Sequence, residues 1–183
     1  MKKKVYIFLA EGFEEMEAIT PLDLLRRVGV DAAFVSTTGK KAVTGAHGVT
    51  YQADLLFEEI DKTADALVLP GGMPGTLNLK AHEGLSKLLL DFFHEGKWVC
   101  AICAAPMVLG GLGILHGKTA TIYPGMEEHL IGATPVTDEV CVDGNVVTSR
   151  APGTAIPFAL KLAELFTDPA AAASLTSDIV YRK

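Results

Sequence analysis

The 183-residue sequence contains few cysteines, few clustered basic residues and no long hydrophobic run, and each shortage excludes a class of protein. Three cysteines, an odd number, do not suggest the disulfide framework of a secreted domain, so we expect a cytoplasmic protein. The apolar run at residues 5–10 stops at Glu11, too early for a signal peptide, and no other run is long enough to cross a bilayer. The formal charge of −6, with no basic cluster beyond the N-terminal lysines and the Arg26-Arg27 pair, argues against nucleic-acid and membrane partners.

What is present is an alternation of apolar strands and amphipathic helices. Hydrophobic residues make up 49% of the chain, which fits one globular domain over residues 1–183. The predicted strands are residues 5–9, 32–36, 66–69 and 98–102, and the predicted helices between and after them are residues 15–28, 83–94 and 105–112. This order predicts an α/β fold with a mostly parallel sheet covered by helices on both faces.

Glycine-punctuated segments complete the expected architecture. Residues 40–52 predict an antiparallel ribbon appended to the sheet. Residues 136–149 predict a second ribbon that turns at Asp143-Gly144. Two further helices are expected, one over residues 156–166 and one from Pro169 onward.

A cysteine lies where the fourth strand is expected to meet a helix. Residues 97–106 read KWVCAICAAP, an apolar strand that changes at Cys103 into small residues suited to a helix start. Backbone amides and the helix dipole stabilise an anion at such a position, so we expect Cys103 to be a reactive thiolate near neutral pH. The alternative interpretation is a buried, apolar thiol.

The C-x-x-C spacing of Cys100 and Cys103 also permits a redox-pair hypothesis, which strand geometry disfavours. If Cys100 lies within the strand, extended chain separates the two Cα atoms by roughly 10 Å and directs the side chains to opposite faces. A disulfide requires Cα atoms within about 7 Å. We therefore interpret Cys100, and Cys141 in a VCV strand, as core residues.

Two other loops are expected at the same sheet edge as Cys103. Residues 10–17 follow the first strand and residues 70–75 follow the third, and ligands of open α/β sheets bind at the carboxyl ends of the strands. Gly71 and Gly72 permit close backbone approach, so that their amides could donate to a developing oxyanion. The alternative for this pair is a tight turn that requires positive φ. The GGxxG spacing is not a dinucleotide fingerprint.

The loop after the first strand is acidic. For Glu14 and Glu15 we favour a solvated position at the helix start, where the dipole attracts a negative charge. Glu17 lies at the margin of the apolar face. Burial beside the thiol would favour its protonated form, which can donate a hydrogen bond to a thiolate or act as general acid or base. The histidines and cysteines show no usual zinc-ligand spacing, so no metal is expected.

Five motifs in order resemble the ThiJ/PfpI superfamily, specifically its DJ-one branch, over nearly the whole chain. They are EGFEEMEA at 11–18, LLRRVG at 24–29, VLPGG at 68–72, AICAAP at 101–106 and TSRAPGT at 148–154. The resemblance implies a flavodoxin-like three-layer sandwich, as in class I glutamine amidotransferases, and a homodimer. It also implies a nucleophile-elbow cysteine at Cys103 that oxidises readily to a sulfinate, a buried carboxyl partner at Glu17, and an anion pocket lined by the Gly71, Gly72 and Ala104 amides.

The sequence departs from that family at three positions. Tyr123 stands where related proteins place a histidine, so a Cys-His dyad and peptidase activity are not expected, and His116 and His129 are unsupported substitutes. Gln52 stands in place of a cysteine near the family's dimer interface, and His47 replaces an arginine near the pocket mouth. We place Tyr123 and Glu14 at the substrate pocket.

The resemblance implies several functions. The first is catalysis on methylglyoxal-type oxoaldehydes, or on their adducts with proteins, by Cys103 and Glu17 without a cofactor. The alternative is a redox sensor or chaperone that responds to oxidation of Cys103. A role in thiamine biosynthesis is least expected, because nothing resembles a kinase site. We predict the glyoxalase or deglycase function.

Overall fold

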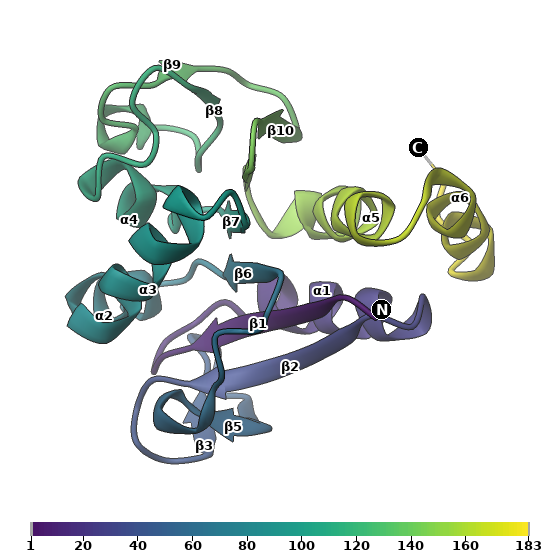
Figure 1. Ribbon diagram of the computed structural model, residues 1–183, viewed down its shortest axis with the longest axis horizontal. Coiled ribbons are helices and arrows are strands. Elements are labelled where there is room, and N and C mark those ends of the chain that lie inside the picture. The colour runs from purple at the N-terminus through teal and green to yellow at the C-terminus, as the bar shows by residue number, and fades with distance from the viewer. Residues whose placement is uncertain (1, 183) are drawn as a thin grey trace.

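The computed structural model describes residues 2–182 (Figure 1). Within them, seven strands form one sheet in the order β10-β11-β7-β6-β1-β2-β5. Their bounds are β1 Lys4–Leu9, β2 Asp31–Ser36, β5 Leu55–Leu56, β6 Ala66–Leu69, β7 Trp98–Ile102, β10 Val140–Asp143 and β11 Val146–Ser149. Every neighbouring pair is parallel except β10 with β11. The predicted mostly parallel sheet is confirmed.

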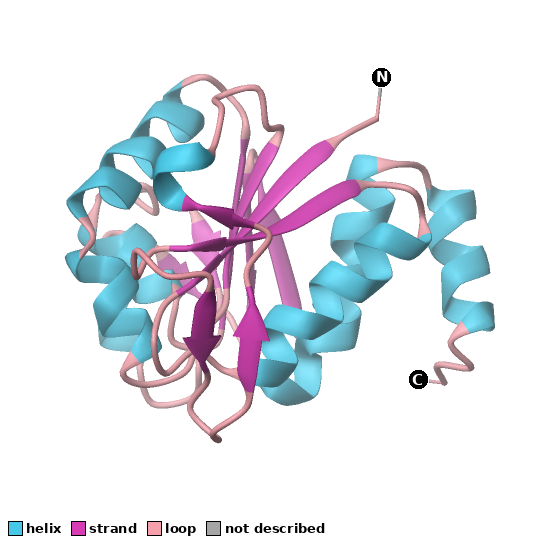
Figure 2. Cartoon of the chain, turned by 90° about the horizontal axis from the view of Figure 1, so that it is seen from below, coloured by secondary structure: helices cyan, strands magenta, loops and turns pink. Residues whose placement is uncertain are grey.

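Helices cover both faces of this sheet (Figure 2). Residues of α1 (Glu15–Arg27) and α5 (Ala155–Phe166) share one apolar layer with the sheet, and α6 (Pro169–Asp178) packs against α5. Residues of α2 (Gly75–Ala81), α3 (Glu83–His94) and α4 (Pro106–Gly111) belong to the opposite layer. The flavodoxin-like three-layer sandwich predicted from the sequence is therefore confirmed.

Strand β7 shows why the inner strands are almost continuously apolar. Cys100 and Ile102 point into the layer of α1 and α5, whereas Val99 and Ala101 point into the layer of α3 and α4. All four side chains are fully buried. A strand covered on both faces needs apolar residues at every position, because successive side chains point to opposite faces.

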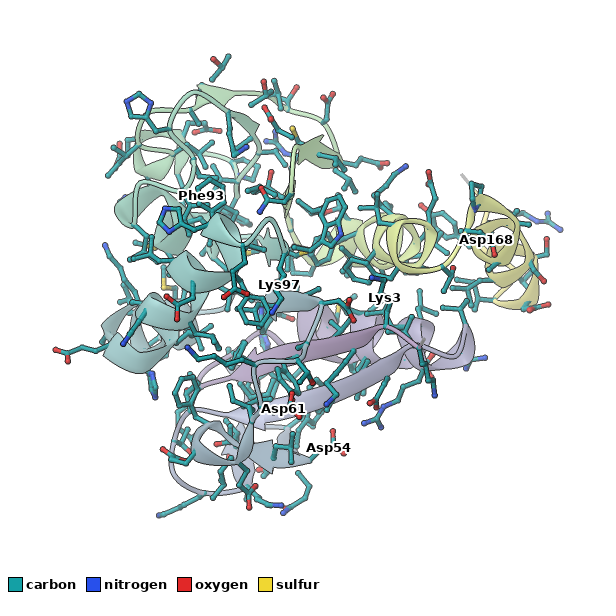
Figure 3. All side chains as sticks on the ribbon, in the orientation of Figure 1. Lys3, Asp54, Asp61, Phe93, Lys97 and Asp168 are labelled. Carbon is teal, nitrogen blue, oxygen red and sulfur yellow. The ribbon has the colours of Figure 1, made fainter. Side chains whose placement is uncertain are left out.

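The predicted ribbons and the terminal helices form, with one correction. Strands β3 (Ala42–Thr44) and β4 (Thr50–Gln52) pair antiparallel but make a sheet of their own, not an extension of the main sheet. Strands β10 and β11 form the second ribbon. Asp168, labelled in Figure 3, accepts a hydrogen bond of 2.8 Å from the Ala171 amide and thereby caps α6.

Several short elements were not predicted. They are α2, β5, the parallel pair β8 (Thr119–Ala120) and β9 (Thr134–Pro135), and the 3-10 turns Phe57–Glu59, Glu127–His129 and Pro152–Thr154. The two-residue strands are too short to show an alternating pattern. Within residues 2–182, no helix combines the length and apolarity needed to span a membrane.

Candidate active site

The loops that follow β1, β6 and β7 meet at one edge of the sheet, as predicted. These strands are neighbours in the order β7-β6-β1. Gly71, after β6, connects the loops, because its N–H donates to Glu17 Oε2 at 2.8 Å and its C=O accepts from the Glu14 N–H at 2.9 Å. The sheet topology therefore brings the glycine loop, the acidic helix start and the cysteine turn together.

Cys103 occupies a sharp turn between β7 and α4. Its φ of +64° lies in the left-handed region, which is unusual for a residue with a side chain. The turn is held by two backbone hydrogen bonds, from the Cys103 N–H to Ser149 O (3.0 Å) and from the Tyr123 N–H to Cys103 O (2.8 Å). Although Cys103 is only 8% exposed, it lines an open cleft. A strained backbone conformation at Cys103 thus places one thiol at the edge of the sheet.

The positive φ of Cys103 also changes the predicted relation to Cys100. Both residues belong to the apolar layer of α1 and α5, so the prediction of opposite faces is wrong. Both are free thiols, as is Cys141. The interpretation of Cys100 and Cys141 as core residues is confirmed, since Cys100 is fully buried and Cys141 is 8% exposed with its Sγ donating to Thr119 O.

Gly71 and Gly72 are needed for different reasons. A Cβ on Gly71 would lie 2.7 Å from Cys103 Cβ and 2.8 Å from Glu17 Oε2, so this glycine permits the close approach of the two functional groups. Gly72 has a φ of +88°, and a Cβ there would lie 2.4 Å from the Glu14 amide nitrogen. The close-approach interpretation thus applies to both glycines, and the positive-φ interpretation applies to Gly72.

Glu17 is the buried carboxyl group that the sequence predicts. Its side chain is fully buried, Oε2 accepts from the Gly71 amide, and Oε1 has no hydrogen-bond partner among the described residues. Burial raises the pKa of Glu17 from 4.5 to about 7, against the lowering effect of hydrogen bonds with Cys103 and Gly71, while the charge of Glu14 raises it further. Near neutral pH, Glu17 can therefore both accept and donate a proton.

The buried surroundings of the thiol oppose the lowered pKa predicted from a helix start. Burial raises the pKa of Cys103 to about 12, and the negative charge of Glu17 and its hydrogen bond contribute in the same direction. Amide hydrogen bonds from Ala104 and Gly72 oppose this rise without overcoming it. Helix α4 begins only at Pro106, so its first turn does not hold the sulfur. The helix-dipole contribution assumed in the thiolate prediction is therefore not present at the sulfur, and the protonation state of Cys103 stays a prediction.

The backbone amides around the sulfur do not all donate hydrogen bonds as the predicted anion pocket requires. The Gly71 amide is engaged by Glu17, so its predicted role as an oxyanion donor is wrong. The Gly72 and Ala104 amides are directed at the sulfur. If the thiol proton moves to Glu17, the charge that opposed the thiolate disappears and these two amides stabilise the anion. The arrangement provides a nucleophile, an adjacent base and two donors.

The cleft over Cys103 has a volume of about 590 Å³. Its lining residues come from six segments of the chain and are Glu14, Glu15, Met16, His47, Val49, Gly72, Cys103, Tyr123 and Pro152. Tyr123 is 45% exposed, which agrees with its predicted place at the pocket. A larger cleft of about 700 Å³ lies between β10, α5 and α6, but it contains none of the predicted site residues.

Glu15 is buried at the mouth of the cleft, which corrects the solvated position predicted for it. It is 7% exposed and accepts from the His47 amide at 2.8 Å and the Val49 amide at 3.4 Å. Glu14 is also largely covered, with 12% of its side chain exposed. The turn between β3 and β4 folds over the start of α1, a contact between segments far apart in the sequence. Burial raises the pKa of Glu15, but hydrogen bonds from His47 and Val49 outweigh it and lower the pKa overall.

His47 stands between the two carboxylates. Its Nδ1 lies 3.0 Å from Glu15 Oε2 and 3.4 Å from Glu14 Oε2, and its hydrogen bond with Glu15 raises its pKa. Ligand atoms of these three residues lie within 4.8 Å of one another, a grouping compatible with a cation, although here they pair with one another. These three residues place charged groups at the mouth of the cleft, beside Cys103.

Comparisons with known proteins agree with this geometry. A model of the DJ-1/PfpI family matches residues 3–165. The chain is 39% identical to protein DJ-1 homolog B of Arabidopsis thaliana over 183 residues, which cover 98% of the chain but 42% of that plant protein. It thus spans about two fifths of this relative. A protein of Pyrococcus abyssi named as a deglycase is 42% identical over 156 residues, 82% of the chain and 91% of that protein.

A solved structure gives the same result for the fold. The oxidized DJ-1 of Toxoplasma gondii superimposes with a TM-score of 0.95 at 33% identity, covering 99% of this chain and 100% of that one. Together with the family match and the relatives above, this confirms the resemblance found in the sequence motifs. The chain belongs to the DJ-1/PfpI family.

Proposed function

We propose that the protein is a cysteine-dependent enzyme of the glyoxalase or deglycase type, acting on methylglyoxal-like oxoaldehydes or their adducts with proteins and small molecules. The observation that carries this proposal is the pairing of Cys103 with a buried Glu17 whose pKa is about 7, beneath an open cleft. The name of the Pyrococcus abyssi relative as a deglycase supports it. This function would protect the cell against carbonyl and oxidative stress.

The chemistry follows from the positions of the two groups. Glu17 takes the proton of the Cys103 thiol as sulfur attacks the aldehyde carbon, and then gives this proton to the former aldehyde oxygen, which yields a hemithioacetal. Glu17 next removes the proton from the former aldehyde carbon and delivers it to the neighbouring carbonyl carbon, while the hydroxyl proton passes to the ketone oxygen through an enediol, which leaves a lactoyl thioester. One water hydrolyses the thioester to lactate and restores the thiol. Methylglyoxal plus water thus becomes lactic acid, and no external oxidant or reductant is consumed.

Partners and assembly are part of the same proposal. We expect a small oxoaldehyde or a glycated protein as substrate, and a cytoplasmic homodimer without a resident metal or organic cofactor. Exposed apolar side chains on and beside α1, Met16 (53%), Ile19 (40%) and Val49 (49%), support a protein contact there. Measurement of the molar mass in solution tests this assembly.

Lactate production from methylglyoxal by metal-stripped protein tests the enzyme proposal. The wild type is compared with Cys103→Ala and Glu17→Gln at equal concentration, and Cys141→Ala is the matched control because it removes a buried thiol outside the cleft. We expect turnover to vanish in Cys103→Ala, to fall at least hundredfold in Glu17→Gln, and to persist in Cys141→Ala. Equal lactate production by wild type and Cys103→Ala would refute the proposal.

A redox sensor or chaperone is the second candidate function, and Glu17 favours it as well. Its Oε1 is fully buried without a partner among the described residues, so a protonated Glu17 has an unused hydrogen-bonding position on the carboxyl group that pairs with Cys103. Oxygen atoms gained by Cys103 on oxidation could accept that hydrogen bond. Fast oxidation of Cys103 by peroxide, followed by mass spectrometry, in a protein without lactate production would favour this candidate.

A further inference from the structure

We propose that Glu14 and Glu15 make the Cys103 cleft selective by charge, so that it accepts neutral or cationic carbonyl compounds and disfavours those that carry a carboxylate or phosphate. This inference rests on the proposed function for its substrate class, but the selectivity itself is a property of access to Cys103. It names Glu14 as the main specificity-determining residue, acting through its charge and not through covalent chemistry.

The first observation is the composition of the cleft wall. Its charged residues are Glu14, Glu15 and His47, and neither lysine nor arginine lines it among residues 2–182. Its remaining side chains are chiefly apolar, from Met16, Val49, Tyr123 and Pro152. Even with His47 protonated, two carboxylates and one imidazolium leave a net negative charge at the mouth.

The second observation is that the positive partner is already engaged. His47 Nδ1 lies 3.0 Å from Glu15 Oε2 and 3.4 Å from Glu14 Oε2. A positive charge on the imidazole therefore pairs with these two carboxylates and is not directed at a ligand. Arg150 is the nearest arginine along the chain to the cleft residue Pro152, but its charge acts on Glu127 and it does not line the cleft.

The third observation is that the field of Glu14 reaches the reacting groups. Its negative charge contributes to the raised pKa of Glu17, the residue paired with Cys103, after the larger effect of burial. The backbone fixes this position, because the Glu14 N–H donates to Gly71 O at 2.9 Å and Glu14 is the N-cap residue of α1. An anionic ligand approaching Cys103 would therefore meet the same unfavourable charge.

Labelling of Cys103 by two reagents of opposite charge tests the proposal without requiring turnover. Trimethylammonium-ethyl methanethiosulfonate and sulfonatoethyl methanethiosulfonate both convert a thiol to a mixed disulfide and release methanesulfinate. The ratio of their rates at Cys103, divided by the ratio for free N-acetylcysteine, removes the intrinsic reactivity of sulfur. We expect a normalised ratio of about tenfold in favour of the cation, the effect of one net negative charge within about 10 Å in a partly solvated cleft.

Three variants and one salt series make the test specific. Glu14→Gln should lower the normalised ratio at least threefold, and His47→Gln should raise it, because the first removes a negative charge and the second a positive one. Glu58→Gln is the matched control, since it removes the same charge from an exposed position outside the cleft. In the wild type, raising NaCl from 20 to 500 mM should bring the ratio toward one.

The outcomes separate this inference from the proposed function. A wild-type ratio near one at low salt, or a ratio unchanged in folded Glu14→Gln, overturns the charge selectivity. In parallel, the conversion of phenylglyoxal and of 4-carboxyphenylglyoxal to the corresponding 2-hydroxy acids is compared. Absence of turnover with a cation-favouring labelling ratio refutes only the enzyme proposal, whereas equal turnover of the two arylglyoxals refutes only the selectivity.

Discussion

Replacing Gly71 by alanine is the sharpest test of how the site is assembled. The added Cβ would lie 2.7 Å from Cys103 Cβ, 2.8 Å from Glu17 Oε2 and 3.1 Å from the Ala104 nitrogen. Ordinary contacts of a Cβ begin at 3.4 Å, so either functional group must move by about 0.7 Å. The backbone of Gly71 does not have a positive φ, so alanine adds a steric conflict without conformational strain.

The expected effect is larger on reactivity than on folding. A displacement approaching 1 Å in a reacting pair costs on the order of a hundredfold in rate, whereas overpacking by one methyl group costs about 1–3 kcal/mol of unfolding free energy. We therefore expect Gly71→Ala to remain folded, by circular dichroism and thermal unfolding, but to lose about 100-fold in lactate production and in alkylation of Cys103 by iodoacetamide.

Gly153→Ala is the matched control for this prediction. Gly153 is exposed, has no positive φ, and a Cβ there would meet no atom within 4 Å. It should therefore match the wild type in both assays. A Gly71→Ala protein that alkylates Cys103 within threefold of the wild-type rate would refute the claim that this glycine sets the distance between thiol and carboxyl.

Three further predictions follow from the buried groups. Because Glu17 binds its proton up to a pKa of about 7 when folded but only to 4.5 at its ordinary value, the folded state holds the extra proton between these values, and its stability falls as pH rises through that window. Denaturant titrations should show a loss of about 3 kcal/mol from pH 4.5 to pH 8, absent in Glu17→Gln. Glu15→Ala should cost about 1–3 kcal/mol and speed hydrogen exchange at the His47 and Val49 amides; unchanged exchange would contradict the proposed anchoring. Cys103→Gly should be more stable than Cys103→Ala by up to about 1 kcal/mol, because glycine accepts a φ of +64° without strain, and the opposite order would exclude strain at this turn.

Local patterns predicted the framework of the fold well. Helix α3 has the predicted bounds of residues 83–94, because Leu85, Leu88, Leu89 and Phe92 place a buried face at helical spacing. The four inner strands were equally visible, since each is apolar at nearly every position. Strands β8 and β9 were missed because two residues that pair across a long loop leave no period to detect.

The site was predicted in its members but not in its electrostatics. Strand ends indicated that Cys103, Glu17 and the glycine loop would meet, because topology alone determines which loops share an edge. The burial of Glu15 depends on a ribbon turn 32 positions away, and the engagement of the Gly71 amide depends on a carboxylate 54 positions away. Local spacing identifies neither of these long-range contacts. The first corrects the solvated position predicted for Glu15, and the second corrects the oxyanion role predicted for Gly71.

The position of Cys103 ahead of helix α4 changes how reactivity must arise in this site. A dipole-stabilised thiolate would need no base. Here burial raises the pKa of both Cys103 and Glu17, because it disfavours the charged form of each group. One proton shared between the two resolves this conflict, because its transfer to Glu17 removes one charge as it creates the other. Reactivity then depends on the carboxyl group as a proton acceptor and not only as a neighbour. Glu17→Gln, which keeps the shape but not the basicity, should therefore slow alkylation of Cys103 at pH 8, whereas a neutral side chain would speed it if the only effect of Glu17 were electrostatic repulsion.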